Sequence, residues 1–238
     1  MTYKRQMEKA IKEYMSSIGF KYYTPRYVYI KKIDDETIFT IGYGTASGYA
    51  KEYYELDIDA CVIFRSWNNL LYQLTGGSCD FDSFLNGPLY FPTRLTWQEK
   101  QVVFTGTRSM EENLADFKEE LETQALPFLE RYTNRETLYH DMVERPDDIH
   151  YLKNLKWYMP IAHYVNGNPK AALQHVEMTL KECEQDYREN PQAPAYIRNL
   201  HDFTLYRKNL LRLIDGWELP PRHTPSVVSQ ILQKLYKK

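Results

Sequence analysis

The chain has 238 residues, of which 43% are hydrophobic and 26% charged, so it is long enough to bury a core as an ordinary globular protein does. Its net charge is −2, yet residues 51–150 carry nine Lys/Arg against nineteen Asp/Glu, and residues 151–238 carry thirteen against eight. An acidic middle argues against nucleic-acid binding, which requires a continuous basic surface, and favours a basic protein partner or attraction between the two halves.

The cysteines and the amino terminus indicate the setting. Three widely spaced cysteines form no CxxC pair, so we expect no disulfide framework, metal site or cofactor. The first residues lead directly into a charged amphipathic segment, and no apolar run approaches the roughly eighteen residues that span a membrane. We therefore expect a cytoplasmic protein without membrane contact.

The first part of the chain predicts one helix and then strands. Apolar side chains recur at helical spacing over residues 2–18, and Gly19 follows where a left-handed residue often ends a helix. Short strands are expected over residues 20–23, 26–33 and 37–43, because apolar residues there alternate between turn signals.

The clearest strand covers residues 53–64, where even-numbered residues are apolar and the first odd-numbered residues are polar. This alternation is typical of an antiparallel strand with one face in the core and the other facing water. The glycine-rich stretch 42–48 before it predicts a flexible hairpin loop. A phosphate-binding loop is not favoured, because no helix follows whose N-terminus could hold an anion.

The next segment changes from strands to helices. Ser66 begins a short helix, and residues 101–105 form the last predicted strand. A long acidic helix begins at Ser109, and Pro127 must kink or restart it because proline lacks the amide hydrogen. The stretch Arg145–Asp148 is the predicted domain boundary.

Only helices are expected beyond that boundary. Their predicted ranges are 149–165, 169–189 and 195–215, and a last amphipathic helix after Pro225 is expected to dock on the helices just before it. Together the patterns predict an α+β protein, with an antiparallel sheet of four to five strands, helices on one of its faces, and a C-terminal helical bundle. The predicted domains are residues 1–145 and 146–238.

Two stretches and the order of elements resemble a known family. Ile18-Gly19-Phe20-Lys21 ends the first helix, and Leu126-Pro127-Phe128-Leu129-Glu130-Arg131-Tyr132 ends the acidic one. In these respects residues 1–143 resemble the bacterial domain-of-unknown-function family numbered 4304, which implies a fold and no chemistry. The stretch 161–180 also resembles one tetratricopeptide-type helical hairpin.

One surface of the clearest strand is the candidate binding site. Glu55, Asp57 and Asp59 project from one face, with neighbours about 6.6–6.8 Å apart. The aromatic residues expected on the same face are Tyr27, Tyr29 and Tyr53. Such a row is most often the solvated face of a half-buried sheet. The aromatic residues beside the carboxylates make recognition of a protein the functional alternative, ahead of a divalent-metal site.

No catalytic pattern is visible in the sequence. The six histidines form neither HxxxH nor HExxH. We therefore expect a non-enzymatic protein-binding module, for which an immunity-type role is one form. The alternative is an enzyme whose site lies at the junction of the two halves, drawing on Glu55, Asp57, His140 or Asp141.

Overall fold

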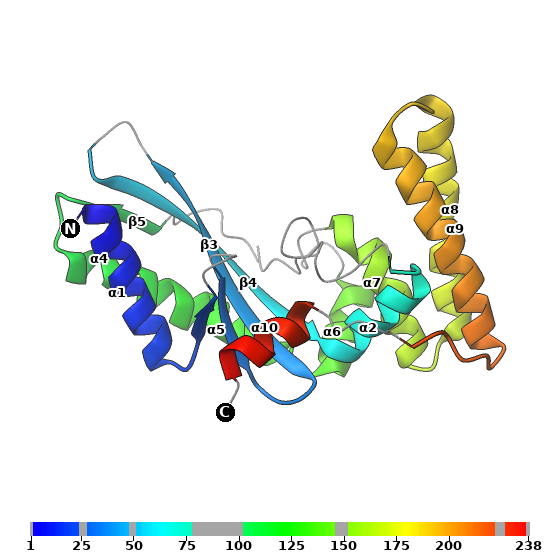
Figure 1. Cartoon of the computed structure of the whole chain (residues 1–238), viewed down its shortest axis with the longest axis horizontal. Coiled ribbons are helices and arrows are strands. Elements are labelled where there is room, and N and C mark those ends of the chain that lie inside the picture. Colours follow the sequence, from blue (N-terminus) through cyan, green and yellow to red (C-terminus); the bar gives the residue numbers. More distant parts are fainter. Residues whose placement is uncertain are drawn as a thin grey trace.

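The computed structural model describes residues 2–23, 28–47, 51–77, 102–145, 152–221 and 227–236, except for the side chains of residues 57, 152–154, 227 and 228. These residues form the predicted α+β fold, a five-stranded antiparallel sheet followed by helices (Figure 1). Each strand pairs with the next one in sequence, so the sheet is a meander. The strands are β1 (Lys21–Tyr23), β2 (Val28–Lys32), β3 (Thr37–Ser47), β4 (Tyr53–Phe64) and β5 (Val102–Thr105).

Strands β3 and β4 form the long central hairpin of the sheet, paired from Thr37↔Phe64 to Ser47↔Tyr54. The expectation of a flexible loop over residues 42–48 was wrong for residues 42–47, which belong to β3. Gly42 and Gly44 pair through their backbones with residues 59 and 57 of β4. Pairing with the long strand β4 therefore holds both glycines in the sheet, although glycine by itself weakens a strand.

One face of the sheet is covered by α1 (Tyr3–Ser17) and α4 (Met110–Glu120). Even-numbered residues of β4 point to this face, and the buried side chains of α1 are Met7, Ile11 and Met15, as the helical spacing predicted. The Phe117 ring of α4 lies at the centre, 6.5 Å from the Tyr43 ring, 6.4 Å from Phe104 and 6.3 Å from Tyr14. Aromatic edges and faces thus join two helices, α1 and α4, to two strands, β3 and β5.

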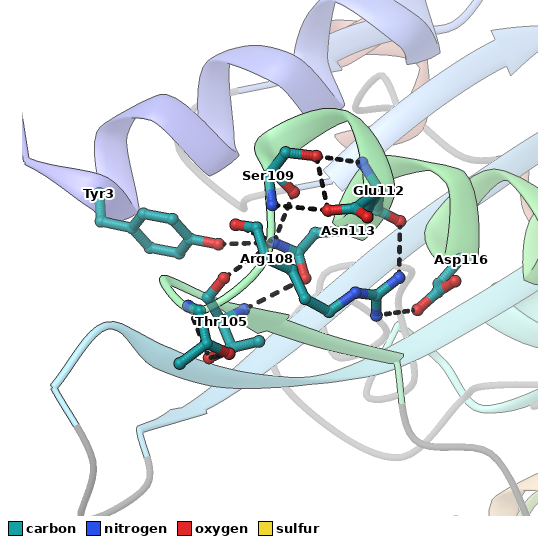
Figure 2. A network of polar contacts seen from close by, with 8 residues as sticks. Tyr3, Thr105, Arg108, Ser109, Glu112, Asn113 and Asp116 are labelled. Carbon is teal, nitrogen blue, oxygen red and sulfur yellow. Dashed lines mark hydrogen bonds and ion pairs between the residues drawn. The ribbon is translucent and has the colours of Figure 1, made fainter.

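The turn between β5 and α4 is fixed by Asn113, which is 0% exposed (Figure 2). Its side-chain amide donates to the Tyr3 hydroxyl and to the Thr105 carbonyl, both at 2.9 Å. Ser109 and Glu112 form a capping box at the start of α4, with the Ser109 amide 2.8 Å from the Glu112 carboxylate. The start of α1 is therefore tied to the start of α4.

The expected interruption at Pro127 takes the form of a π turn. Residues Leu121–Ala125 (η2) are π-helical between α4 and α5 (Leu126–Arg131), and the Leu126 amide bonds to the Leu121 carbonyl five residues back. A widened turn removes the close approach between the proline ring and the carbonyl four residues earlier, so the helix continues through Pro127.

The helical half combines elements that are distant in sequence. It contains α6 (Arg135–Glu144), α7 (Leu152–Val165), α8 (Pro169–Glu189) and α9 (Pro194–Ile214), and α2 (Arg65–Leu74) from the sheet half packs against α7 and α9. The Asn209 amide on α9 donates to the carbonyls of Gln73 and Leu74, at 3.2 and 3.0 Å, and so caps the end of α2. Buried apolar side chains of both halves form one continuous cluster.

The last three long helices define the outline of this half. Helices α7 and α8 pack as a hairpin, and Asn168 caps α8 by accepting from the Ala171 amide, as predicted. The α8–α9 pair projects away from the sheet (Figure 1). None of the described helices combines the length and the apolar character that a membrane span requires.

The last described helix, α10 (Val227–Tyr236), does not pack where the sequence suggested. Docking on the preceding helices was expected, but α10 lies across the end of the sheet and contacts β1 (Figure 1). An amphipathic stripe shows that a helix face becomes buried, and it does not show against which element.

Candidate functional site

The candidate surface is the first half of the sheet face opposite α1 and α4. Odd-numbered residues of β4 point to it, and Tyr53, Glu55 and Asp59 are all partly exposed there. The register places Ala46, Gly44 and Gly42 of β3 opposite residues 55, 57 and 59. We call this set the polar half-face, made of Tyr53, Glu55, Asp57, Asp59, Gly42, Gly44 and Ala46.

The neighbouring strand leaves room beside the carboxylates. Two glycines and an alanine carry little or no side chain, and a Cβ added at Gly42 would meet nothing within 4 Å. Another backbone could therefore approach this stretch of β3 closely, as glycine often permits. The side chain of Asp57 lies outside the described residues, so its place in the row follows from the backbone register alone.

Tyr53 stands at the start of the acidic row. Its hydroxyl donates to a Glu55 carboxylate oxygen at 3.2 Å. Desolvation and this hydrogen bond to Glu55 raise the pKa of Tyr53, so the phenol keeps its proton. An aromatic ring with a bound carboxylate is a suitable anchor for a basic side chain.

One of the tyrosines assigned to this surface, Tyr29, requires correction. Tyr29 pairs with Ile41, which pairs with Ala60, so its side chain points to the face that α1 and α4 cover. It is only 1% exposed, and burial raises its pKa well above the ordinary value. The sequence prediction failed because both faces of β2 are buried, and alternation then cannot identify the solvent side. Tyr27 lies outside the described residues.

The second half of the same sheet face is apolar and buried. Thr40 pairs with Cys61 and Ile38 with Ile63, and all four side chains are buried. Helix α10 lies at this end, where its Ser229 hydroxyl accepts from Arg65 at 3.0 Å. One face of the sheet is therefore divided into a covered apolar half and an acidic half beside it.

A buried carboxylate joins α5 to α6. The Asp141 side chain is 4% exposed and accepts from Arg131 at 2.7 and 3.1 Å, from Arg145 at 2.8 Å and from the Tyr132 hydroxyl at 2.9 Å. We call Arg131, Tyr132, Asp141 and Arg145 the Asp141 cluster. Burial alone would raise the pKa of Asp141, but the bonds from Arg145, Arg131 and Tyr132 outweigh it and hold this pKa well below its usual range.

An open pocket of about 400 Å³ lies over the Asp141 cluster, lined by Arg131, Glu136, Thr137, His140, Asp141 and Arg145. The His140 ring lies between two carboxylates, 3.6 Å from Asp141 and 3.2 Å from Glu144. A carboxylate held ionised by two arginines is a weak base, because proton uptake would break its ion pairs. The Asp141 cluster therefore links α5 to α6, and its arrangement is suited to a structural role.

The residues proposed for a junction enzyme fall into two separate pairs. Glu55 lies nine residues before Phe64, about 30 Å along β4 at the usual rise per residue. The start of α6 lies beside Phe64, and the Arg135 guanidinium is 5.1 Å from the centre of the Phe64 ring. An extended strand therefore separates Glu55 and residue 57 from His140 and Asp141, so no single site combines the two pairs, and a junction enzyme that draws on one of these residues stays a prediction.

The sequence reading missed one group of histidines. The Tyr139 hydroxyl and His163 Nδ1 are 3.0 Å apart, and the His163 and His175 ring centres are 6.3 Å apart. Burial lowers the pKa of both histidines, so both rings are neutral near pH 7. The sequence signal that could have identified this group is the helical hairpin expected over residues 161–180, since it brings His163 beside His175. Within the described ranges, no three His, Cys, Asp or Glu side chains come together as metal ligands would.

The fold and its surfaces define an α+β protein with an acidic sheet face and a helical half. No family model matches this chain, and no curated protein or solved structure shows significant similarity to it. Membership of the family numbered 4304 therefore stays a prediction.

Proposed function

We propose that this protein works by binding a basic segment of another protein on its polar half-face. The observation that supports the proposal is the division of one sheet face, whose apolar half is covered by α10 while Tyr53, Glu55 and Asp59 of the other half are partly exposed. Carboxylates gathered on one exposed surface attract a partner of opposite charge.

The spacing of the acidic row suggests the form of the partner. Side chains two residues apart on a strand are separated by about 6.6–6.8 Å, so an extended segment with Lys or Arg at every second residue has the same repeat. The small side chains of Gly42, Gly44 and Ala46 leave space for its backbone along β3. Surface ion pairs contribute roughly 0.2–1 kcal/mol each, so the affinity should be moderate and should fall with salt.

The proposal includes a cytoplasmic bacterial setting and no catalytic step. Cys61 and Cys183 are both buried as thiols, which suits a reducing compartment. The Asp141 cluster is engaged in ion pairs and hydrogen bonds between helices, which favours a structural role for it. An immunity-type role, with a toxin as the basic partner, is one form of this function.

The test is fluorescence anisotropy with labelled peptides that alternate Lys and small residues. The variant Glu55→Lys/Asp59→Lys should bind at least about tenfold more weakly, a difference of about 1.4 kcal/mol. The matched control is Glu111→Lys/Glu182→Lys, which makes the same change of net charge at exposed positions on α4 and α8. Circular dichroism checks that both variants are folded.

The outcomes separate local recognition from general charge. Loss of binding in the sheet variant but not in the control supports the proposal. Equal loss in both variants would show attraction to net charge alone, and absence of peptide binding by the wild-type chain at low salt would also refute the proposal.

A further inference from the structure

Helix α10 is held on the sheet face from both of its ends. Near its start, the Ser229 hydroxyl accepts from an Arg65 guanidinium nitrogen at 3.0 Å. Near its end, the Leu235 carbonyl accepts from the Lys21 ammonium group, also at 3.0 Å. Arg65 follows β4 and Lys21 begins β1, so α10 runs from the end of β4 across to β1 (Figure 1).

Tyr236 attaches the end of α10 to the backbone of β2. Its hydroxyl donates to the Ile30 carbonyl at 3.2 Å and accepts from the Lys32 amide at 3.3 Å. The Lys21 ammonium lies 3.9 Å from the centre of the Tyr236 ring. Strand β1 pairs with β2 only as far as Ile30. Tyr236 therefore bonds to backbone groups of β2 at and just beyond the end of this pairing.

The middle of α10 supplies apolar side chains, and Ile231 and Leu232 are 2% and 8% exposed. The helix has ten residues, fewer than the roughly 12–15 that an isolated helix needs in water, so its helical state depends on docking. Such elements are the ones that detach first in local unfolding.

The charge of this end of the chain matches the surface beside it. After Glu218 the sequence contains no Asp or Glu, and its four basic residues are Arg222, Lys234, Lys237 and Lys238. The apolar half of the sheet face, where α10 lies, continues directly into the polar half-face, because Cys61 and Asp59 are successive odd-numbered residues of β4. The stretch 222–238 is thus basic, its helix α10 is amphipathic, and the acidic row lies next to it.

We propose that α10 is a displaceable occupant of the apolar half of this face, and that the protein partner carries, next to the basic extended segment of the proposed function, an amphipathic helix that takes the place of α10. This inference rests on the proposed function and specifies its partner. The partner's apolar stripe would cover Ile38, Cys61 and Ile63, and its basic residues would reach the polar half-face. Helix-in-groove recognition of this kind places apolar anchors at helical spacing.

The test uses the full chain with Ile231→Asp and Leu232→Asp, which removes the apolar anchors of α10, and a fluorescein-labelled peptide of residues 222–238. The peptide should bind this variant at least about tenfold more tightly than it binds the wild-type chain, whose site is occupied. Binding should weaken with salt and on addition of Glu55→Lys/Asp59→Lys. The control peptide carries the same two aspartates and should not bind.

A milder variant distinguishes displacement of α10 from loss of folding. Ser229→Ala/Tyr236→Phe removes the hydroxyl groups that hold the two ends of α10 and leaves its apolar anchors, so it should give an intermediate increase in peptide affinity. Hydrogen exchange of the β3 and β4 amides reports whether the sheet is intact in each variant.

Three outcomes would overturn the inference. One is a folded variant that fails to bind the peptide, and another is equal affinity for the variant and the wild-type chain. The third is a wild-type dimer that dissociates on the double substitution, since α10 would then be exchanged between copies. If the lysine-alternating peptides still bind the wild-type chain through Glu55 and Asp59, only the identity of the partner is refuted and the proposed function stands.

Discussion

Replacement of Asp141 by Asn should destabilise the fold by about 2–4 kcal/mol at neutral pH. The substitution removes the buried negative charge that Arg131, Arg145 and Tyr132 share, while the shape of the side chain is kept. Hydrogen bonds to a charged group contribute roughly 1.5–3 kcal/mol each. The two arginine side chains are 48% and 50% exposed, so water recovers part of their interaction and the total stays well below the sum.

The pH dependence of this effect has a defined sign. The pKa of Asp141 is lowered in the folded state, so its contribution to stability is present above the ordinary carboxyl pKa of about 4 and is lost as the pH falls toward the folded value. The free energies of unfolding of wild type and Asp141→Asn should therefore converge below about pH 4.

The assay is urea unfolding followed by circular dichroism at several pH values. The control is His140→Ala, because the His140 side chain is 61% exposed and its loss should change stability by no more than about 0.5 kcal/mol. An Asp141→Asn chain as stable as the control at pH 7, or a stability difference that does not shrink in acid, would refute the assignment of Asp141 as a buried, ionised clamp.

Two further predictions concern buried polar groups. Asn113→Ala should lower the free energy of unfolding by about 2–3 kcal/mol, because the Tyr3 hydroxyl and the Thr105 carbonyl lose a buried donor, and an unchanged urea midpoint would contradict this. Burial lowers the pKa of His163 and His175, so the stability they contribute is present above about pH 6.5 and is lost as the pH falls toward their folded values. Replacing both histidines by Gln should flatten the fall of the thermal midpoint between pH 7 and pH 5, and the same slope in both proteins would show that other groups titrate there.

Elements with one buried face could be predicted closely from the sequence. The spacing of Met7, Ile11 and Met15 identified the buried side of α1, and the even-numbered residues of β4 identified its core side. Local periodicity is sufficient in these cases because α1 and the first half of β4 are each covered on one side only. Helix α8 was predicted to cover residues 169–189, which are its observed bounds, because the signals of Asn168 and Pro169 lie at its start.

Features that depend on contacts between distant residues could not be predicted in this way. Tyr29 was assigned to the wrong face because β2 is buried on both sides, once by α1 and α4 and once at the end where α10 lies. The ion pairs of Asp141 with Arg131 form across the turn between two helices, at a separation of ten residues. No local pattern marks either case, since the first depends on helices far apart in sequence that cover both faces of β2, and the second depends on how two consecutive helices pack.

The π turn at Leu121–Ala125 determines the rotational phase of everything that follows it in this helix. A π turn contains about one residue more than an α turn, and one residue corresponds to about 100° of rotation around the helix axis. Without this extra residue, the direction that buries Phe128 and Leu129 would be shifted by that angle, and Arg131 would point away from Asp141. The turn therefore sets two separate alignments within one continuous helix, the upstream part against the sheet and the downstream part against α6.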